Sequence, residues 1–318
     1  MVKYEESSVE AIRSMLRESD GAAFDKSRSA NQELTFDYAG KYFMDANLPF
    51  SDSNKRTLNL IDADGYFTNA ALLLSDQCEY SIKCAVYDGM SKTKFKARKE
   101  FFGSVLKQMD DVYEYLSINN NLNSTFDKLK RVDHPDYPPY ALRETLMNSI
   151  AHRDYDYSGS TLVNIFDDRM EFVSLGGLVK GLTLDDIMDG VSQPRNMIIA
   201  NIFFRLELIE SYGTGIGRIM DSYENCLRRP MFRPNPASFV VMLPKMISGS
   251  SLGESGFSPE ESVISLIAAK GFVTRSDVEA LLNISRNPAI ALLNRLVDEG
   301  TIVKKGAARA VRYTLPNR

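Results

Sequence analysis

The chain has 318 residues, of which 44% are hydrophobic and 25% are charged, and its formal net charge is −4. This composition is typical of a soluble globular protein with two or three domains, and it excludes disordered and repeat-built chains.

Signals for membranes, secretion and structural zinc are missing from the sequence. No apolar run approaches the roughly 18 residues of a membrane span, and no apolar signal segment follows Met1. Three unevenly spaced cysteines fit a reducing compartment, and two histidines offer no zinc-ligand spacing. We therefore expect a cytoplasmic protein that has no membrane partner.

Hydrophobic periodicity predicts mostly helices in the first third of the chain. In chain order, the expected elements are helices at 6–17 and 34–46, a helix, turn and apolar segment at 53–76, and a strand at 82–89. Apolar residues recur at helical spacing from Lys99 to Asn119, beginning with Phe102. This stretch should therefore form a helix with one face on a sheet.

The middle of the chain alternates strands with helices and glycine-rich turns. Three prolines in DHPDYPPY break the chain at 133–140, and TLVNIFDD with RMEFVSL then predicts a β-hairpin around Asp167 to Arg169. The elements expected next are a Gly-rich stretch at 176–181, a polar connection to SQPRN at 192–196, a helix at 198–208, the turn GTGIG at 213–217, a helix RIMDSYENCL, and a strand at 237–244. This order predicts an α+β sandwich, in which a mixed sheet carries helices on one face.

Small, flexible residues at 246–258 predict a linker between two domains. We therefore divide the chain into an N-terminal helical segment at 1–65, the α+β domain at 66–245, the linker, and a C-terminal domain at 259–318. The last domain has nine Lys and Arg against six Asp and Glu, which gives +3 there and −7 for the rest. Either this domain meets a polyanion, or the imbalance is ordinary scatter.

The stretch RETLMNSIAHRDYDY at 143–157 places Glu144, Asn148 and His152 on one helix face. That face is either solvated or part of a site. A metal that bridges phosphates could take the side-chain carbonyl of Asn148, and the carboxylate of Glu144 could orient or deprotonate a water. The turn GTGIG could cradle phosphates with backbone N–H groups. Each signal alone occurs by chance, but their order, with the hairpin between them, favours a joint site.

Three runs together resemble a known family: YPPYALRETLMNSIAHRDYDYSG, VNIFDDRMEFVSLGGLVKGLTLDDI and SQPRNMIIANIFFRLELIESYGTGIGRIM. They are similar to the RecG-like C-terminal domain of bacterial and archaeal transcriptional regulators, a divergent branch of the GHKL ATPases. The resemblance covers residues 137–243 and implies a GHKL-like α/β sandwich with ATP and Mg²⁺ as ligands. Residues 47–119 are similar to the segment that precedes this domain. Because a Schlafen-like AlbA-type domain often comes first in such proteins, the chain is expected to be a shortened form or a fragment.

The resemblance also implies roles for individual residues. Glu144 would be the catalytic base that handles water, and Asn148 would ligate Mg²⁺. The nucleotide-binding residues that it implies are Asn148, Gly176 and Gly177 at the adenine-reading turn, Arg195 in the lid, and Gly213, Thr214, Gly215 and Gly217 in the second glycine box. From the residues alone, Arg195 could equally be a solvated loop residue.

One departure from the family pattern concerns adenine. Working GHKL ATPases have Asp-x-Gly-x-Gly, whereas this chain has Ser174-Leu175-Gly176-Gly177 with no Asp in place. A missing buried hydrogen bond can cost about 1–3 kcal/mol, so the resemblance leaves open whether ATP is bound, or hydrolysed weakly. The family signature at 152–154 either holds the helix terminus, through a histidine bond to the backbone and an Arg153–Asp154 pair, or contacts the ligand.

The last 60 residues resemble a winged helix-turn-helix domain of bacterial repressors, with three helical segments and a terminal hairpin. Such domains place the third helix in the major groove, although some serve only in protein contacts. The DNA-binding residues expected here are Ser285, Arg286, Asn287, Asn294 and Arg295 on the third helix, and Lys304, Lys305, Arg309 and Arg312 in the wing.

The leading hypothesis is a transcriptional regulator that binds double-stranded DNA through the winged helix. A nucleotide or other small ligand, with ATP and Mg²⁺ as the candidates, would be sensed in the GHKL-like domain. A homo-oligomer, usually a dimer on a palindrome, is the expected assembly. Two alternatives stay open: an ATPase that acts on or with nucleic acid, and a degenerate GHKL fold that serves only for dimerisation.

Overall fold

The computed structural model describes residues 23–127, 130–210, 213–224, 226, 228–246, 259–282, 284–306 and 311–316. The chain divides into two compact units. The first comprises Met1–Asn121, Pro139–Ile219 and Met231–Leu243, and the second comprises Leu122–Pro138, Met220–Pro230 and Pro244–Arg318. The helix expected at 6–17 lies outside the described residues. The domain limits expected from the sequence stay a prediction.

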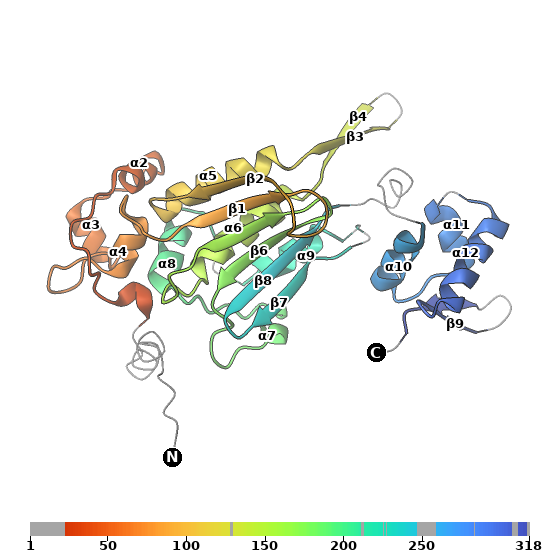
Figure 1. The fold of residues 1–318 in the computed structure, drawn as a ribbon. Coiled ribbons are helices and arrows are strands. Elements are labelled where there is room, and N and C mark those ends of the chain that lie inside the picture. The colour runs from red at the N-terminus through yellow and green to blue at the C-terminus, as the bar shows by residue number, and fades with distance from the viewer. Residues whose placement is uncertain are drawn as a thin grey trace, which may run out of the picture. The chain divides into compact units, whose positions relative to one another are not determined.

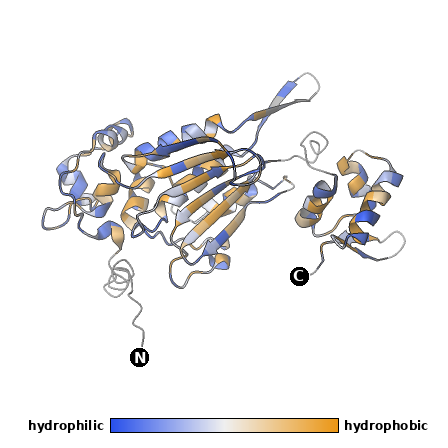
Figure 2. Cartoon of the chain, viewed as in Figure 1, coloured by the Kyte–Doolittle hydropathy of each residue, from blue (hydrophilic) through white to orange (hydrophobic). Residues whose placement is uncertain are grey.

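The first unit is built on a six-stranded sheet in the order β2-β1-β5-β6-β8-β7 (Figure 1). Its strands are β1 (Ile82–Tyr87), β2 (Phe95–Phe101), β5 (Thr161–Ile165), β6 (Arg169–Leu175), β7 (Met231–Asn235) and β8 (Ser238–Pro244). β1 and β5 run parallel, whereas β1–β2, β5–β6 and β7–β8 are antiparallel. The mixed sheet and the hairpin around residues 167–169 are therefore confirmed. Hydrophobic residues lie along the central strands, whereas the edge strand β2 is mostly hydrophilic (Figure 2).

Two long helices cover one face of this sheet and enclose the core. α5 (Val105–Ile118) packs on β1 and β2, α6 (Pro139–Ala151) packs on β6, and the two helices contact each other behind the sheet in Figure 1. Leu106, Leu142 and Phe172 are buried between these layers. The other elements of this unit are a 3-10 helix η1 (Phe24–Lys26) and the helices α2 (Asp37–Asp45), α3 (Asp52–Thr57), α4 (Asn69–Leu74), α7 (Leu184–Met188), α8 (Met197–Arg205) and α9 (Gly215–Asp221).

The helix predicted at 99–119 is wrong at its start. Residues 95–101 form β2, in which Phe101 pairs with Ile82, and α5 begins only at Val105. Phe102, expected on the buried face of that helix, is 56% exposed. The segment KFKARKEF is rich in charged residues, as edge strands often are, and a count of apolar residues at helical spacing does not detect such a strand.

Three further differences lie near the glycine turn and the sheet edge. The helix expected for RIMDSYENCL is short, because α9 ends at Asp221. The polar connection before SQPRN contains α7, which begins with a capping box between Thr183 and Asp186. β7 contains Pro234, which reads as a strand breaker in sequence but is tolerated in an edge strand, where one side of the backbone needs no partner.

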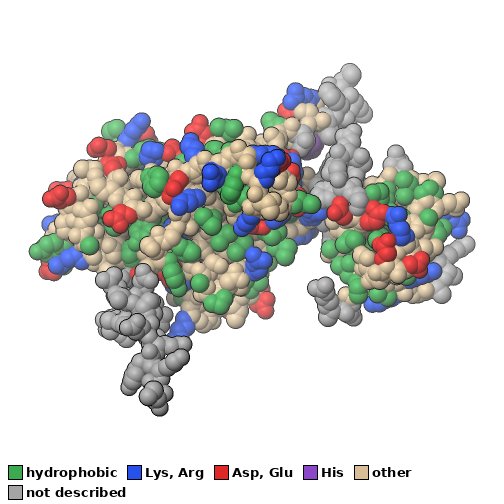
Figure 3. Space-filling model, viewed as in Figure 1, with side chains coloured by type: hydrophobic (Ala, Val, Ile, Leu, Met, Phe, Trp, Pro, Cys, Tyr) green, Lys and Arg blue, Asp and Glu red, His purple; other side chains and the backbone are tan. Residues whose placement is uncertain are grey.

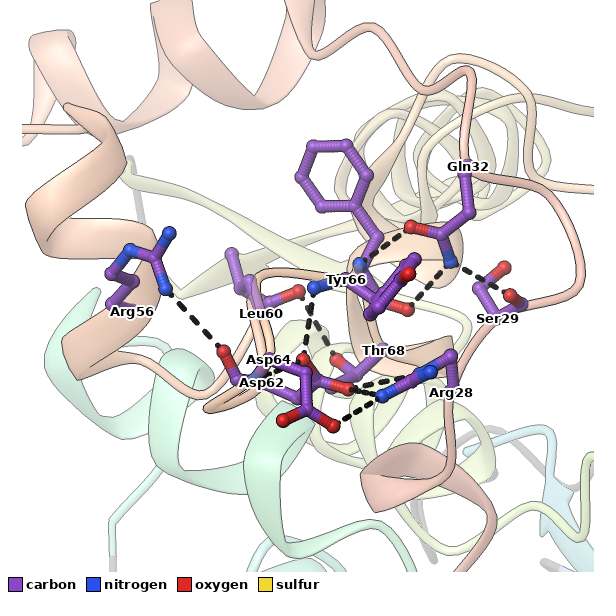
Figure 4. Close-up of polar contacts among 10 residues, drawn as sticks. Arg28, Ser29, Gln32, Arg56, Leu60, Asp62, Asp64, Tyr66 and Thr68 are labelled. Atoms are coloured by element: carbon purple, nitrogen blue, oxygen red, sulfur yellow. Dashed lines mark hydrogen bonds and ion pairs between the residues drawn. The ribbon is translucent and has the colours of Figure 1, made fainter.

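The turn expected within residues 53–76 is present at Asp62 to Gly65, and it contacts the start of the described chain (Figure 4). The Oδ1 atom of Asp62 accepts backbone N–H groups of Asp64 at 3.0 Å and Tyr66 at 2.9 Å. Arg28 donates to Asp62 at 3.1 Å and to Asp64 at 2.7 Å, and its guanidinium lies 3.8 Å from the centre of the Tyr66 ring. These contacts hold the segment after η1 against the turn.

The second unit contains a two-stranded ribbon and a small helical part. β3 (Leu122–Asp127) and β4 (Lys130–Pro135) pair antiparallel. The helical part has α10 (Pro259–Lys270), α11 (Arg275–Leu282) and α12 (Arg286–Asp298), followed by the antiparallel pair β9 (Val303–Lys305) and β10 (Arg312–Thr314). Val263, Leu281, Leu293 and Tyr313 lie in its apolar core. Among the described residues of the whole chain, we find no helix long and apolar enough to cross a membrane.

Candidate functional site

A cavity of about 460 Å³ lies inside the first unit, between α6 and the sheet. It is lined by residues of α6, β6, the segment 176–194, α8, β7 and β8, together with Ile209, Glu210 and residues of the segment 213–219. Most lining side chains are apolar, and Phe172, Phe232 and Phe239 line it from the strands. Half of the polar lining side chains come from α6 and the residue after it, and the others are Ser174, Ser192, Gln193, Asn201 and Glu210.

Glu144 and Asn148 of α6, and His152 directly after it, all line this cavity. We call these three residues the α6 stripe. The Nδ2 atom of Asn148 donates to Oε1 of Glu144 at 3.2 Å, so the two side chains act as one polar unit. Glu144 is only 8% exposed, and burial is the main reason why the pKa of its carboxyl is raised. The face predicted from the sequence thus borders a cavity, and its role as a site stays a prediction.

His152 ends the stripe at the other end of α6. Burial, and to a smaller extent the nearby Arg195 guanidinium, lower the pKa of His152 to about 4. The imidazole is therefore neutral at pH 7, when it can accept one hydrogen bond and donate another. Arg153 and Asp154 do not pair with each other as one reading of the sequence expected. Arg153 is buried and donates to the carbonyls of Tyr157 and Gly159.

The glycine turn meets α6 across the cavity. A Cβ atom on Gly215 would lie 2.0 Å from Oε1 of Glu144, so only glycine leaves room for that carboxylate in its present position. A Cβ atom on Gly213 would lie 1.9 Å from the carbonyl oxygen of Gly190, and Gly213 has a φ of +67°. The turn is thus packed between α6 and the segment that follows α7. The contact of Gly213 with the Gly190 backbone requires glycine, whereas a side chain at position 215 would displace the Glu144 carboxylate.

The other expected turn, at Gly176 and Gly177, also lines the cavity. A Cβ atom on Gly177 would lie 2.6 Å from the carbonyl oxygen of Asn235, so this turn fits tightly against the end of β7. Arg195 donates to the carbonyl oxygen of Gly177 at 3.0 Å and lies 3.5 Å from Asp154. Its guanidinium therefore braces the turn from outside the cavity lining.

The cavity brings together most of the residues that the sequence predicted for the nucleotide site. Those that line the cavity are Glu144, Asn148, Gly176, Gly177, Gly213 and Gly215, whereas Arg195, Thr214 and Gly217 do not. Sequence reasoning missed Glu210, which lines the cavity, and Tyr140, which stands one helical turn before Glu144. Extending the four-residue spacing backwards from Glu144 would have found Tyr140, but no local pattern marks Glu210.

A divalent cation could be held by Asn148 together with ligand oxygens. Because Nδ2 of Asn148 points to Glu144, its carbonyl oxygen is left for a hard cation such as Mg²⁺, which keeps several waters and takes few protein ligands. Within the described part of the chain there is no group of three or more His, Cys, Asp or Glu side chains that could hold a metal ion on its own. The residues therefore fit Mg²⁺ only as a shared ion with a phosphate ligand.

The residues expected to contact DNA lie on the surface of the helical part of the second unit. Ser285, Arg286, Asn287, Asn294, Arg295, Lys304, Lys305 and Arg312 are all exposed, and Arg309 lies outside the described residues. Arg295 forms an ion pair with Glu260, and the Arg312 guanidinium lies 4.3 Å from the centre of the Phe272 ring.

Comparisons with known proteins agree with the fold of the first unit. Residues 160–243 match the family described as "Putative ATP-dependent DNA helicase recG C-terminal". Gly176, Gly177, Arg195 and the glycine turn lie within the matched segment, whereas α6 precedes it. No curated protein matches the chain.

One similar solved structure is the DIP2311 protein from Corynebacterium diphtheriae, with a TM-score of 0.64 and 19% sequence identity. The match covers 95% of this chain and 66% of that protein, so the chain spans just under two thirds of its length. At this identity the likeness concerns the fold alone. The family match adds that an ATPase-like RecG C-terminal domain is present at residues 160–243.

Proposed function

We propose that the cavity of the first unit binds a nucleoside triphosphate with Mg²⁺, and that residues 259–318 bind double-stranded DNA in a nucleotide-sensing transcriptional regulator. The observation that carries the nucleotide proposal is the meeting of three groups in one cavity. Glu144 of α6 lies against Gly215 of the glycine turn, and Asn148 lines the same cavity, inside a unit that contains an ATPase-like domain. Two segments about 70 residues apart in sequence thereby supply a carboxylate, an amide and close-packed backbone to one space.

Each group has a chemical task in this proposal. Mg²⁺, when bound with the nucleotide, supplies positive charge to the phosphate oxygens. Asn148 would hold that ion through its side-chain carbonyl, and Gly213 and Gly215 would let the backbone come close to the phosphates. Glu144 would orient a water next to the terminal phosphate. The raised pKa of its buried carboxyl makes Glu144 a stronger proton acceptor than a solvated glutamate.

The base would lie against the apolar walls. Phe172, Phe232 and Phe239 offer aromatic surface, and the neutral His152 offers hydrogen bonds. Among the described residues that line the cavity, the carboxylates are those of Glu144 and Glu210, and the Asp154 carboxylate next to Gly176 lies outside the lining and 3.5 Å from Arg195. We therefore expect weak discrimination between adenine and other bases.

Thermal unfolding with and without ATP and Mg²⁺ tests the nucleotide proposal. At about 100 times its dissociation constant, a ligand stabilises the folded protein by roughly 2.7 kcal/mol, which raises the midpoint measurably. Asn148→Ala should abolish the Mg²⁺-dependent part of this rise, whereas the control Asn294→Ala, on α12, should keep it. A wild-type protein whose midpoint does not respond to ATP would contradict the proposal.

The buried Glu144 also favours a second candidate, an ATPase that acts on or with nucleic acid. In that case Glu144→Gln should retain ATP binding but lose turnover, because the amide cannot accept the proton of the attacking water. Phosphate release measured with and without DNA separates this enzyme from a sensor that only binds.

The DNA-binding proposal draws support from α12 and β9. Arg286, Asn287 and Asn294 project from one helix of a three-helix part, and Lys304 and Lys305 project from the adjacent two-stranded sheet. In a winged helix-turn-helix, these positions correspond to the recognition helix and the wing. The +3 balance of residues 259–318 is consistent with a DNA partner.

A further inference from the structure

The ion pair of Arg218 with Glu210 borders the cavity. Nη1 of Arg218, on α9, donates to Oε1 of Glu210 at 2.6 Å, and the hydroxyl of Thr214 donates to Oε2 of Glu210 at 3.4 Å. Tyr140 stands on α6 one helical turn before Glu144, and the nearby Arg218 guanidinium favours its ionised form. Glu210 lines the cavity, so the pair borders the space in which we place the phosphates.

The charges in this region are unfavourable for a phosphate ligand as they stand. Glu144 and Glu210 both line the cavity, and the charge of Arg218 is neutralised by Glu210. The pKa of Glu144 is raised mainly by burial, with a smaller contribution from Glu210 and an opposing one from Arg218, so the three groups sense one another. A polyphosphate entering this end of the cavity would be repelled unless the arginine changed its partner.

The exchange of partners is physically easy here. The side chains of Arg218 and Glu210 are 46% and 52% exposed, and an exposed ion pair contributes little to stability. A planar guanidinium matches phosphate geometry and can form two parallel hydrogen bonds to it. Glu210, once released, can turn into water without leaving a buried charge.

We propose that Arg218 binds the phosphates of the ligand, and that Arg218 is paired with Glu210 while the cavity is empty. This proposal rests on the nucleotide function proposed above and adds its selectivity: the cavity would distinguish a nucleoside polyphosphate from the corresponding nucleoside. The Glu210 carboxylate sets the affinity, because every bound phosphate must first displace it from Arg218.

The test compares four proteins and three ligands. Binding of ATP, ADP and adenosine, each with Mg²⁺, is measured by calorimetry for the full chain, Glu210→Gln, Arg218→Gln and the double variant. Glu210→Gln should bind ATP several-fold more tightly, because the phosphates no longer compete with a carboxylate for Arg218. Arg218→Gln should bind ATP about tenfold more weakly, because a charge-assisted hydrogen bond is lost. The double variant should match Arg218→Gln, since Glu210 acts only through the arginine. Adenosine affinity should be the same in all four proteins.

A matched control is the half-buried pair Arg275 and Glu279 on α11, whose substitutions to Gln should leave ATP affinity unchanged. ATP binding that is equal in wild type, Glu210→Gln and Arg218→Gln would overturn this inference and leave the nucleotide function standing. An equal change for ATP and adenosine would also overturn it, because it would indicate a structural effect. If the wild type binds none of the three ligands, both proposals fail.

Discussion

Two residues at opposite ends of the α6 stripe are held toward their neutral forms by burial. Glu144 has a raised pKa and His152 has a lowered one, so both changes oppose charge inside the cavity. Asn148 lies between them and donates to Glu144. The stripe therefore offers a proton acceptor, an amide and an imidazole at fixed four-residue spacing, with little net charge added by the histidine at pH 7.

His152 makes stability depend on pH. Its pKa is about 4 in the folded protein against 6.5 in an unfolded chain, so the unfolded state binds the proton more readily. Stability is then fully present above pH 6.5 and is lost as pH falls through 6.5 toward 4, by at most about 3 kcal/mol. Urea unfolding between pH 7.5 and 4.5 should show this loss, and His152→Gln should flatten the slope. An unchanged slope in the variant would assign the loss to other groups.

Two glycines in α9 give opposite expectations. Gly215→Ala would place a methyl group on the Glu144 carboxylate and push it aside, whereas a methyl group on Gly217 meets nothing within 4 Å. Gly217→Ala should therefore raise stability by up to about 1 kcal/mol through helix propensity and keep the response to ATP. Gly215→Ala should weaken that response. Thermal unfolding with and without ATP measures both, and loss of the response in Gly217→Ala would instead support the phosphate role expected for Gly217 from the sequence.

At the scale of elements, α8 is capped from a distant part of the chain. Asp25 in η1 is fully buried, and its Oδ2 accepts the backbone N–H of Ile198 at 2.6 Å. Asn196, which immediately precedes α8, instead donates to the carbonyl oxygens of Ala151 and Arg153. The start of α8, a wall of the cavity, is thus tied both to η1 and to the end of α6.

Removing this remote cap should loosen α8. Asp25→Ala leaves the N–H of Ile198 without a partner and should cost about 1–2 kcal/mol of unfolding free energy. Asp25→Asn keeps an acceptor oxygen and should retain most of that stability, because burial already disfavours the charged carboxylate. Urea unfolding compares the three proteins. Equal stability of wild type and Asp25→Ala would mean that the bond contributes nothing.

At the scale of the whole molecule, the two ends of the chain differ in charge pattern. On the face of the first unit that Figure 3 shows, Lys and Arg lie among Asp and Glu, as in the ion pairs of Lys94 and Lys96 with Asp88. In the helical part of the second unit, Arg286, Lys304 and Lys305 are exposed and carry no ion pair that involves a described residue. A polyanion would therefore meet free cations on that part.

DNA binding should accordingly depend on salt through the second unit. Arg286→Gln and Lys304→Gln should each reduce the slope of log K against log salt concentration by about 1, because each removes one phosphate contact. Fluorescence anisotropy with a DNA duplex at several salt concentrations measures the slope. The control Lys41→Gln, at an exposed residue of α2, should leave the slope unchanged. An equal effect of all three variants would indicate attraction to net charge without a defined DNA surface.

Local patterns in the sequence were enough to predict several elements. The two short segments joined by turn residues predicted the β5–β6 hairpin, and four-residue spacing placed Glu144, Asn148 and His152 on one face of the helix that is α6. These features depend on interactions between residues that are close together in the chain, so a short stretch of sequence is enough to predict them. The same reasoning failed for β2 and β7. Whether a charged or proline-containing segment joins a sheet depends on its being at an edge, which the segment itself does not reveal.

The cavity itself was decided by tertiary structure. Three contacts around the cavity join segments that are far apart in the sequence, and no sequence pattern indicates that they meet. They are the contacts of Gly213 with Gly190, of Gly215 with Glu144, and of Asp25 with the start of α8. Glu210 entered the site only because the turn at 213–215 folds back onto α6. The sequence by itself determined the residue types available for phosphate chemistry and their order along the chain. Packing of the helices on the sheet determined which of them share one space, because burial and close approach are properties of the whole fold.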